Sequence, residues 1–364
     1  MANKRKGKIL FYFMLISVIC YLFAPFSTLI GGEDVYDIQL FNHAFSKPSI
    51  FKGGYIEGAK LIGADRFAER GNYGEGITVA VIDSGCDINH PNLKDRIIGY
   101  KNFTNDDNGN PHIVTDYTGH GTHVCGIIGA SDIGNDGIIG VAPKCNLLVL
   151  KALSKNGGKS SWVANAIKYA ILYQNVDIIS MSLGSNQPSQ EMRNAIQEAI
   201  KRGIVVVVSA GNNGDNNSQT MELNYPASFN ECITVGSVTY SKRNSRFTAT
   251  SREIDLVALG EGYNSRGVLS TYPNGLYKEM KGTSMATPFV SGALALLKNW
   301  FKKEFGRTPT ESELYAQLIK CTVDLDMPKT LQGNGMLYLC IEDITDKLIF
   351  NDKLIEKILN DEIN

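Results

Sequence analysis

The sequence predicts an α/β protein built on a doubly wound, mostly parallel central sheet with helices on both faces. Two observations lead to this fold class. Residues 77–82, 176–180 and 204–208 are rich in β-branched side chains and too continuously apolar for half-exposed strands, so they indicate buried parallel strands. Segments with helical periodicity lie between these runs, and a pair of parallel strands needs such a crossover.

The crossover helices are expected at residues 161–174 and 190–202. In the second segment the apolar residues recur at i, i+3, i+4, i+7 and i+8, and Gly203 then supplies a stop. A further helix is expected after Thr310, because Thr310 and Glu313 have the spacing of a capping box. Buried strands and amphipathic helices therefore alternate along most of the chain.

The length of 364 residues favours one large folded domain with terminal extensions over two equal domains. We place the folded domain at residues 62–340. A linker or short pro-segment is expected at residues 33–61, and an amphipathic tail at residues 341–364. Residues 1–32 are expected to form a hydrophobic membrane anchor or a signal segment.

The amino-terminal segment bears on where the protein resides. Basic residues cluster at residues 4–8, and residues 9–32 carry no charge, which approaches a membrane-spanning length. Because basic residues stay on the cytoplasmic side, we expect a membrane-anchored protein with an extracytoplasmic folded domain, or a secreted one. The seven scattered cysteines form no Cys-x-x-Cys pair and suit a reducing compartment, which favours a cytoplasmic alternative.

The charge balance disfavours one class of partner. Lys and Arg total 36 against 37 Asp and Glu, which gives a formal net charge of -1. The chain therefore has no overall positive charge that would favour nucleic acid as a partner.

Three separate motifs place an acid, an imidazole and a hydroxyl in the chain order Asp, His, Ser. Asp83 ends the first buried run, so its carboxylate would be desolvated and needs a partner. His120 can be that partner through one ring nitrogen, and Gly119 and Gly121 are expected to leave room for substrate around the ring. Ser284 stands among small residues at the expected start of a long apolar helix. A serine nucleophile needs a base within reach and a third group that fixes the base, which this set supplies.

Acyl transfer also needs hydrogen-bond donors for the oxyanion that develops on the attacked carbonyl. Asn212 follows the most apolar run of the chain and offers its side-chain amide, although Asn-Asn-Gly is also an ordinary turn sequence. The backbone N–H of Ser284, at a helix start, is expected to supply the second bond. In a parallel sheet these groups would meet at the carboxyl edge, where such sites form.

With these motifs in place, the chain resembles the subtilisin family of serine proteases, and within it the intracellular subtilisins. The resemblance covers residues 62–339 and is carried by Asp83-Ser84-Gly85-Cys86-Asp87, Gly119-His120-Gly121-Thr122-His123, Asp177-Ile178-Ile179-Ser180-Met181-Ser182-Leu183-Gly184, Tyr225-Pro226-Ala227, Gly282-Thr283-Ser284-Met285-Ala286 and Gly333-Asn334-Gly335. It implies a single catalytic peptidase domain, a catalytic triad of Asp83, His120 and Ser284, and Asn212 in the oxyanion hole.

The resemblance also implies a cleft that holds an extended peptide by strand-like backbone bonds. Its two walls would be the stretches Asn156, Gly157, Gly158 and Ser182, Leu183, Gly184. Asn224 would lie near the base of the primary side-chain pocket without a fixed charge, which favours large apolar or uncharged residues before the cleaved bond.

Regulation, metal and partners follow from the same resemblance. Short amino-terminal segments restrain intracellular subtilisins, and residues 47–51 are expected to cross the active site similarly. No cofactor is required for the chemistry, but structural calcium is expected near the loop that follows the helix of His120. Residues 131–136 offer oxygen ligands there, and Asn92 stands where secreted relatives often have a carboxylate, so the metal ligands stay unassigned. Protein or peptide substrates are the expected partners, and a homodimer is a further expectation.

Three functions stay open at this point. The first is a serine endopeptidase that hydrolyses extended polypeptide through an acyl-enzyme intermediate. The second is a membrane-tethered peptidase that processes one exported precursor. The third is an inactive subtilase scaffold that binds a partner, which the intact motifs disfavour.

Overall fold

The computed structural model describes residues 36–40, 43–44, 53–131 and 137–339, all within one compact unit that begins at Tyr36. The expected anchor or signal segment, residues 1–32, and the expected tail, residues 341–364, lie outside the described residues. Within the described ranges, no helix combines the length and the apolar character that crossing a bilayer requires.

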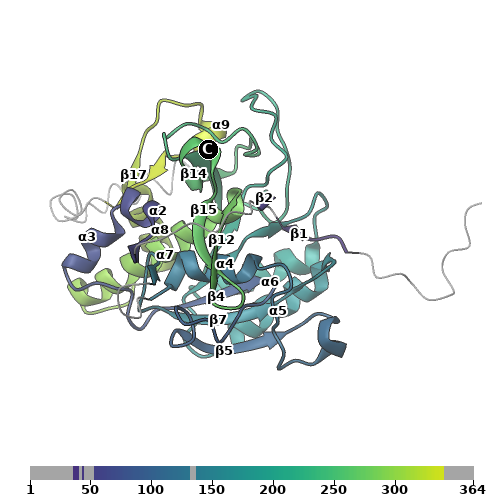
Figure 1. Cartoon of the computed structure of the whole chain (residues 1–364). Helices are drawn as coiled ribbons and strands as arrows, with labels where there is room; N and C mark the ends of the chain where they lie inside the picture. Colours follow the sequence, from purple (N-terminus) through teal and green to yellow (C-terminus); the bar gives the residue numbers. More distant parts are fainter. Residues whose placement is uncertain (1–35, 41–42, 45–52, 132–136, 340–364) are drawn as a thin grey trace, which may run out of the picture. The chain divides into compact units, whose positions relative to one another are not determined.

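A large sheet of mainly parallel strands forms the centre of the fold. In the described part of the chain it holds nine strands in the order β17-β18-β14-β13-β12-β10-β4-β7-β5, and β17 pairs antiparallel with β18 (Figure 1). The predicted fold class is confirmed. The strands are β4 (Thr78–Asp83), β5 (Ile97–Asn102), β7 (Asn146–Lys151), β10 (Ile178–Met181), β12 (Val205–Ser209), β13 (Ile233–Thr239), β14 (Ile254–Glu261), β17 (Thr322–Val323) and β18 (Met336–Leu337).

Helices cover both faces of this sheet, because alternate residues of each buried strand point to opposite sides. In β4, Val79 and Val81 pack into one hydrophobic core, whereas Ala80 and Ile82 pack into the other. Figure 1 shows α5 and α6 on one side of β4 and α7 on the other. The first core includes α4 (His120–Gly129) and α7 (Thr283–Phe305), and the second includes α5 (Ser160–Leu172) and α6 (Gln190–Lys201).

The predicted elements are confirmed to within two residues at their ends. α8 (Glu311–Lys320) begins where the capping box places it, since Thr310 accepts from the Glu313 backbone and Glu313 accepts from the Thr310 backbone. The structure thus agrees with the periodicity of the buried runs.

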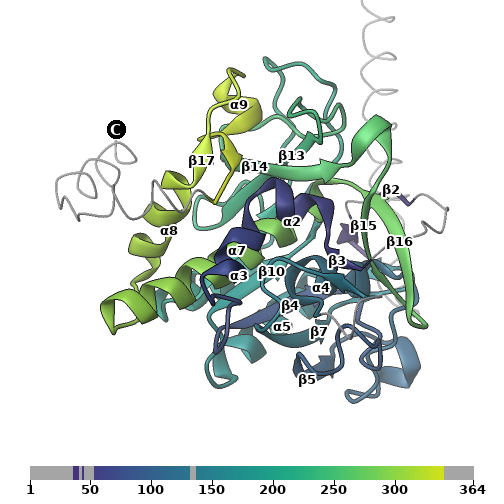
Figure 2. The same ribbon diagram turned by 60° about the vertical axis from the view of Figure 1, so that its left-hand side comes forward.

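Smaller elements surround the central sheet. The β15–β16 hairpin extends along one side with β2 beside β16 (Figure 2). These elements are β1 (Gln39–Leu40), β2 (His43–Ala44), β3 (Gly54–Tyr55), α2 (Glu57–Leu61), α3 (Ala64–Glu69), the 3-10 helix η1 (Asp106–Gly109), β6 (Ile138–Ile139), β8 (Leu153–Ser154), β9 (Gly157–Gly158), β11 (Leu183–Gly184), the 3-10 helix η2 (Tyr263–Ser265), β15 (Val268–Tyr272), β16 (Leu276–Lys281) and α9 (Lys329–Gln332).

Part of the expected linker of residues 33–61 is packed structure. Ile56, just before α2, and Ala59, within α2, are buried in the same core as Ile62. Because these apolar side chains gain from leaving water, residues 53–61 fold with the domain that we expected to begin at residue 62.

Candidate active site

The predicted polar groups meet at the carboxyl edge of the central sheet. Asp83 is the last residue of β4, Ser182 follows β10, and Asn212 lies beyond the end of β12. The three strands are neighbours in the order β12-β10-β4 and run parallel, so their carboxyl ends lie together. This is the edge at which sites form in open parallel sheets.

Asp83 and His120 are in contact. His120 Nδ1 and Asp83 Oδ1 are 2.7 Å apart, and the two side chains are 0% and 1% exposed. The backbone N–H of Ser84 donates to the same oxygen at 2.7 Å. The carboxylate therefore holds the imidazole by a charge-assisted hydrogen bond in a buried environment. The other ring nitrogen, Nε2, takes no part in this bond.

The two glycines beside His120 allow close packing, which differs from their expected role of leaving room for substrate. A Cβ on Gly121 would lie 2.1 Å from the carbonyl oxygen of Gly85, and one on Gly119 would lie 2.0 Å from the Tyr272 ring. Gly119 also has φ 77°, which favours glycine. The space around the helix start is thus filled by protein atoms.

Ser284 lies in the first turn of α7, and its hydroxyl makes no hydrogen bond with the imidazole. Ser284 Oγ donates to the carbonyl of Ser182 at 3.1 Å. His120 Nε2 is buried and has no hydrogen-bond partner among the described residues. The structure therefore brings Asp83 and His120 into contact, whereas Ser284 is bonded to a neighbouring backbone group.

Ser182 fixes the start of α7 through a second bond. The carbonyl of Ser284 lacks its usual helical donor, because the residue four positions later is Pro288, which has no N–H. Ser182 Oγ donates to this carbonyl at 2.9 Å. The peptide units of the two serines are thus held together by reciprocal hydrogen bonds.

Asn212 presents an unpaired amide donor at the same edge. Its Oδ1 accepts from the backbone N–H and the hydroxyl of Thr283, both at 2.9 Å. Its Nδ2 is buried and without a partner among the described residues. A buried amide N–H₂ that faces no acceptor is costly, which suits a group that binds an oxyanion during the reaction.

Asn224 is buried and lies against the strand that ends near Asn212. Its Nδ2 donates to Ala210 O at 3.0 Å and to Asn213 Oδ1 at 2.8 Å. A Cβ on Gly211 would lie 2.3 Å from Asn224 Nδ2, so the amide packs directly behind Gly211. Its donors are occupied by protein acceptors, and it adds no charge there.

An extended segment of the chain itself lies between the two expected cleft walls. β1 pairs antiparallel with β11, at Leu183 and Gly184. On the other side Ile38 pairs with Gly158, through Ile38 N to Gly158 O at 3.1 Å and Gly158 N to Ile38 O at 2.9 Å. The stretches predicted to bind a peptide are thus paired with residues 38–40.

Side chains fix this segment at its upstream end. The carboxylate of Asp37 accepts from the backbone N–H of Ser160 at 2.9 Å and from the Ser160 hydroxyl, at the amino end of α5. Tyr36 packs edge-on against Trp162 with ring centroids 5.9 Å apart. A carboxylate at a helix amino terminus is stabilised by the helix dipole and by free N–H groups.

Downstream, the segment reaches the strand that leads into the serine motif. His43 and Ala44 pair antiparallel with Lys281 and Met280 of β16. Residues 41–42 lie outside the described residues, as do residues 47–51, which we expected to cross the active site. Residues 36–40 and 43–44 therefore flank the site on both sides.

Asn92, expected near a calcium ion, does not fit a calcium ligand set. Its Nδ2 donates to the carbonyls of Ser131 at 2.7 Å and Ile138 at 3.4 Å. Calcium needs oxygen ligands, and here an amide nitrogen faces both oxygens. Residues 132–136 lie outside the described residues, among which no group of three or more His, Cys, Asp and Glu side chains is placed to hold a metal.

His123, one turn after His120, is a packed structural residue. Its Nε2 donates to the carbonyls of Val268 at 2.9 Å and Lys278 at 3.0 Å. Burial, with a smaller contribution from His120, lowers the pKa of His123 to about 3. The ring is thus neutral at pH 7 and joins α4 to the β15–β16 hairpin.

Sequence reasoning missed two parts of this region. Residues 36–40 have no motif, and only their position between the expected anchor and the core pointed to them. Lys151, which is fully buried beside Asp83 in the sheet, was also missed. A charged residue that ends the apolar run of residues 147–150 was the available signal.

The chain is similar to known proteins over most of its length. Residues 74–335 match the model of the Subtilase family. The chain is 51% identical over 289 residues to the major intracellular serine protease of Bacillus subtilis (strain 168), covering 79% of this chain and 88% of that protein. It is 48% identical over 289 residues to the intracellular serine protease of Paenibacillus polymyxa, covering 79% and 86%. It is 37% identical over 241 residues to subtilisin DY of Bacillus licheniformis, covering 66% and 83%.

Proposed function

This chain belongs to the subtilase family and is a serine endopeptidase, and we propose that Asp83, His120 and Ser284 perform its chemistry. The observation that supports this assignment most strongly is the buried Asp83–His120 hydrogen bond at 2.7 Å, with His120 Nε2 left unpaired. An imidazole held in this way has a fixed tautomer and a free nitrogen to act as base.

In the proposed reaction, Ser284 Oγ first leaves the carbonyl of Ser182 by rotation about its side-chain bond. It attacks the carbonyl carbon of the peptide while His120 Nε2 takes its proton. The tetrahedral intermediate then collapses, the C–N bond breaks, and the leaving amine takes the proton from His120. Water attacks the acyl-enzyme by the same route and regenerates the hydroxyl. This chemistry needs no cofactor.

We assign the oxyanion hole to the unpaired Nδ2 of Asn212 and the backbone N–H of Ser284. The support for Asn212 is that Thr283 holds its Oδ1 by two bonds, which fixes the direction of the opposite amide nitrogen. Donors that are already oriented cost no reorganisation when charge develops on the substrate oxygen.

The substrate in this proposal is an extended polypeptide between the two cleft walls, Asn156, Gly157, Gly158 and Ser182, Leu183, Gly184. The pairing of residues 38–40 with Gly158, Leu183 and Gly184 supports it, because a substrate strand would make the same backbone bonds. Backbone hydrogen bonds depend on the extended shape of the substrate more than on the identity of its side chains. With Asn224 uncharged behind Gly211, we propose large apolar or uncharged residues before the cleaved bond, and a strict preference for Lys or Asp in a peptide library would contradict this.

We further propose that the segment containing residues 36–40 and 43–44 restrains the enzyme, with residues 38–40 occupying its own substrate cleft. The backbone pairing on both walls and the Asp37–Ser160 bonds support this role. A peptide substrate has to displace the segment before it reaches Ser284. Removing the segment is therefore expected to raise the initial rate of peptide hydrolysis, and an unchanged rate would contradict the restraint.

The location and the bound metal are two separate proposals. We propose an intracellular location, because the two relatives above 45% identity are named intracellular serine proteases. The uncharged run of residues 9–32 supports the rival of a membrane-tethered processing enzyme, and fractionation of cells separates the two. A homodimer, as expected from the family, is tested by light scattering. We propose a structural calcium with its ligands unassigned, and the effect of a chelator on Tm tests it.

A fluorophosphonate probe, which reacts with activated serine hydroxyls, tests the central assignment. We expect the full chain to be labelled and to hydrolyse casein, and Ser284→Ala to do neither. The matched control is Ser291→Ala, a buried serine further along α7 whose hydroxyl bonds to Ser180. Labelling or hydrolysis that survives in Ser284→Ala would overturn the assignment, and a protein that stays unlabelled and inactive after the restraining segment is removed would favour the inactive scaffold.

A further inference from the structure

Lys151 is a fully buried cation at the carboxyl edge of the sheet, and the proposed mechanism does not use it. It is the last residue of β7 and pairs in register with Asp83 of β4. Its side chain is 0% exposed, and its Nζ is 3.1 Å from Asp106 Oδ2, a carboxylate that is 5% exposed. A buried charge is costly unless it is paired and hydrogen-bonded. A residue that only filled space in this core would be more favourable as an apolar side chain. The buried charge of Lys151 therefore needs a specific explanation.

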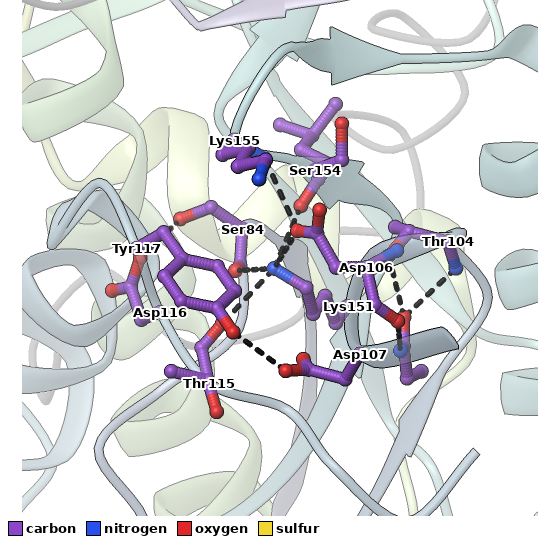
Figure 3. Close-up of polar contacts among 12 residues, drawn as sticks. Ser84, Thr104, Asp106, Asp107, Thr115, Asp116, Tyr117, Lys151, Ser154 and Lys155 are labelled. Atoms are coloured by element: carbon purple, nitrogen blue, oxygen red, sulfur yellow. Dashed lines mark hydrogen bonds and ion pairs between the residues drawn. The ribbon is translucent and has the colours of Figure 1, made fainter. Parts of the chain in front are cut away.

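The ammonium group joins three segments of backbone. Lys151 Nζ donates to the carbonyl oxygens of Ser84 at 2.7 Å, Thr115 at 3.0 Å and Leu153 at 3.2 Å. Figure 3 shows Ser84, Thr115 and Asp106 converging on the nitrogen from different sides. The segment after β4, the loop before α4 and the start of the β8–β9 hairpin are thus bound to one cation.

One of these bonds leads to the catalytic acid. Lys151 holds the carbonyl of Ser84, while the N–H of Ser84 donates to Asp83 Oδ1 at 2.7 Å. The same oxygen receives the bond from His120 Nδ1. The hydroxyl of Ser84 also accepts from Gly121 N at 3.0 Å, at the start of α4. The orientation of Ser84 therefore fixes the carboxylate and the helix that carries the imidazole.

The other bonds lead to one wall of the cleft. Leu153 pairs with Gly158, and Gly158 in turn makes both backbone bonds with Ile38. Asp106, the ion-pair partner of Lys151, accepts from the backbone N–H of Lys155 at 3.1 Å, within the same hairpin. The ammonium and its carboxylate thus hold the first strand and the turn of the hairpin.

We propose that Lys151 is a positioning residue that keeps the catalytic acid and the β8–β9 wall of the cleft in register, so that a bound peptide meets an oriented Asp83–His120 pair. This inference rests on the proposed roles of Asp83, His120 and Ser284. Catalysis is sensitive to such placement, because a displacement of about 1 Å can cost about 10²-fold in rate.

The chain offers a matched control in a second buried lysine. Lys298 Nζ is 2.9 Å from Asp177 Oδ1, with the two side chains 5% and 14% exposed. Asp177 precedes β10 and accepts from the backbone N–H of Thr78, so this pair lies at the amino edge of the sheet, away from the carboxyl edge. Lys298→Met removes a buried ammonium on α7 that pairs with a carboxylate at the amino edge of the sheet, and it leaves the groups at the carboxyl edge in place.

The experiment compares full-length variants by Tm and by kcat and KM on a short and a long peptide. We use Lys151→Met, Lys151→Met with Asp106→Asn, Lys298→Met and Ser284→Ala. Loss of Lys151 is expected to lower kcat roughly 10- to 100-fold on both peptides. Saturating peptide displaces the segment containing residues 36–40 and 43–44, so a change in that segment alters KM and not kcat.

The double variant separates positioning from stability. It removes both buried charges, so we expect it to recover much of the Tm that Lys151→Met loses, while kcat stays low because the three carbonyls still lack their donor. Lys298→Met is expected to lower Tm and leave kcat unchanged. Recovery of kcat together with Tm in the double variant, or an equal kcat loss in Lys298→Met, would overturn the inference. Activity in Ser284→Ala would overturn the proposed function instead.

Asp106→Asn alone keeps the proposal testable if Lys151→Met fails to fold. The ammonium then keeps its three carbonyl partners, and only its link to Lys155 is weakened. We expect a rise in KM for the long peptide that exceeds any fall in kcat for the short one. A fall in kcat for the short peptide that exceeds the rise in KM for the long one would contradict the proposed role of Lys151 at both the catalytic acid and the cleft wall.

Discussion

Two buried Lys–Asp pairs sit at opposite edges of the same parallel sheet, and their surroundings differ. Lys298 reaches from α7 to Asp177 and ties a helix to the amino ends of the strands. Lys151 reaches Asp106 and three carbonyls of loops that follow or flank the carboxyl ends. We infer that a Lys–Asp ion pair stabilises the fold at the amino edge and positions the site at the carboxyl edge, where loops carry function.

The greatest loss of stability is expected when the Lys298–Asp177 pair at the amino edge is broken. Lys298→Met leaves the Asp177 carboxylate partly buried and unpaired, which typically costs about 3–5 kcal/mol of folding stability when one partner of a buried pair is removed. We expect a lower free energy of unfolding in urea with an unchanged kcat. Lys298→Met with Asp177→Asn is the control and should recover part of the loss. A kcat that falls with stability would erase the distinction between the two edges.

Asn212→Ala tests the carboxyl edge directly. It removes the unpaired Nδ2 and leaves Thr283 without its acceptor. We expect kcat to fall about 10²–10³-fold with little change in KM, the loss already known for the corresponding side chain of subtilisin. Exposed Asn165→Ala, on α5, serves as the control. A rise in KM at constant kcat would mean that Asn212 binds the ground state and not the transition state.

A smaller effect is expected where the chain covers its own site. Asp37→Ala removes the carboxylate that accepts two bonds from Ser160, and a hydrogen bond to a charged group contributes about 1.5–3 kcal/mol. Asp37 is only half-buried, so we take the lower end and expect about a tenfold faster initial rate on a peptide. Exposed Asp95→Ala is the control. If both variants match the parent, the segment does not restrain the enzyme through this bond.

The smallest effect at neutral pH is expected at His123. It lies on the same helix as His120, but it is a structural residue and not the proposed base. Its folded pKa, about 3, lies below its unfolded value near 6.5, so the unfolded chain binds the proton first. Stability from this group is complete above pH 6.5 and falls as the pH drops toward 3. We expect His123→Gln to flatten this fall by up to about 1.4 kcal/mol per pH unit. Urea unfolding between pH 7 and pH 4 measures the slope, and parallel curves for parent and variant would contradict the assignment.

The fold and much of the site could be predicted from residue patterns. Continuous apolar runs locate the parallel strands, and Asp83 and Asn212 follow two of them, so the carboxyl-edge rule brings them together. The pairing of Asp83 with His120 follows from the need of a buried carboxylate for a partner. These inferences use periodicity and short motifs, which act locally.

Other features depend on tertiary contacts that a single sequence does not display. The direction of the Ser284 hydroxyl depends on the carbonyl of Ser182, which lies 102 positions away. Lys151 finds its partners at Ser84 and Asp106 only after the loops have closed on the sheet. The orientation of the Asn92 amide follows from carbonyls contributed by other segments.

The pairing of residues 38–40 with the cleft has a consequence for how the enzyme responds to its concentration. An occupant on the same chain competes at a fixed effective concentration, of millimolar order for a short flexible connection, whatever the amount of protein present. Dilution therefore cannot release it, whereas a single cut between residues 44 and 53 turns it into a separate peptide that diffuses away. Covalent cleavage is then expected to remove the restraint permanently, whereas a saturating peptide displaces the intact segment only while it is bound.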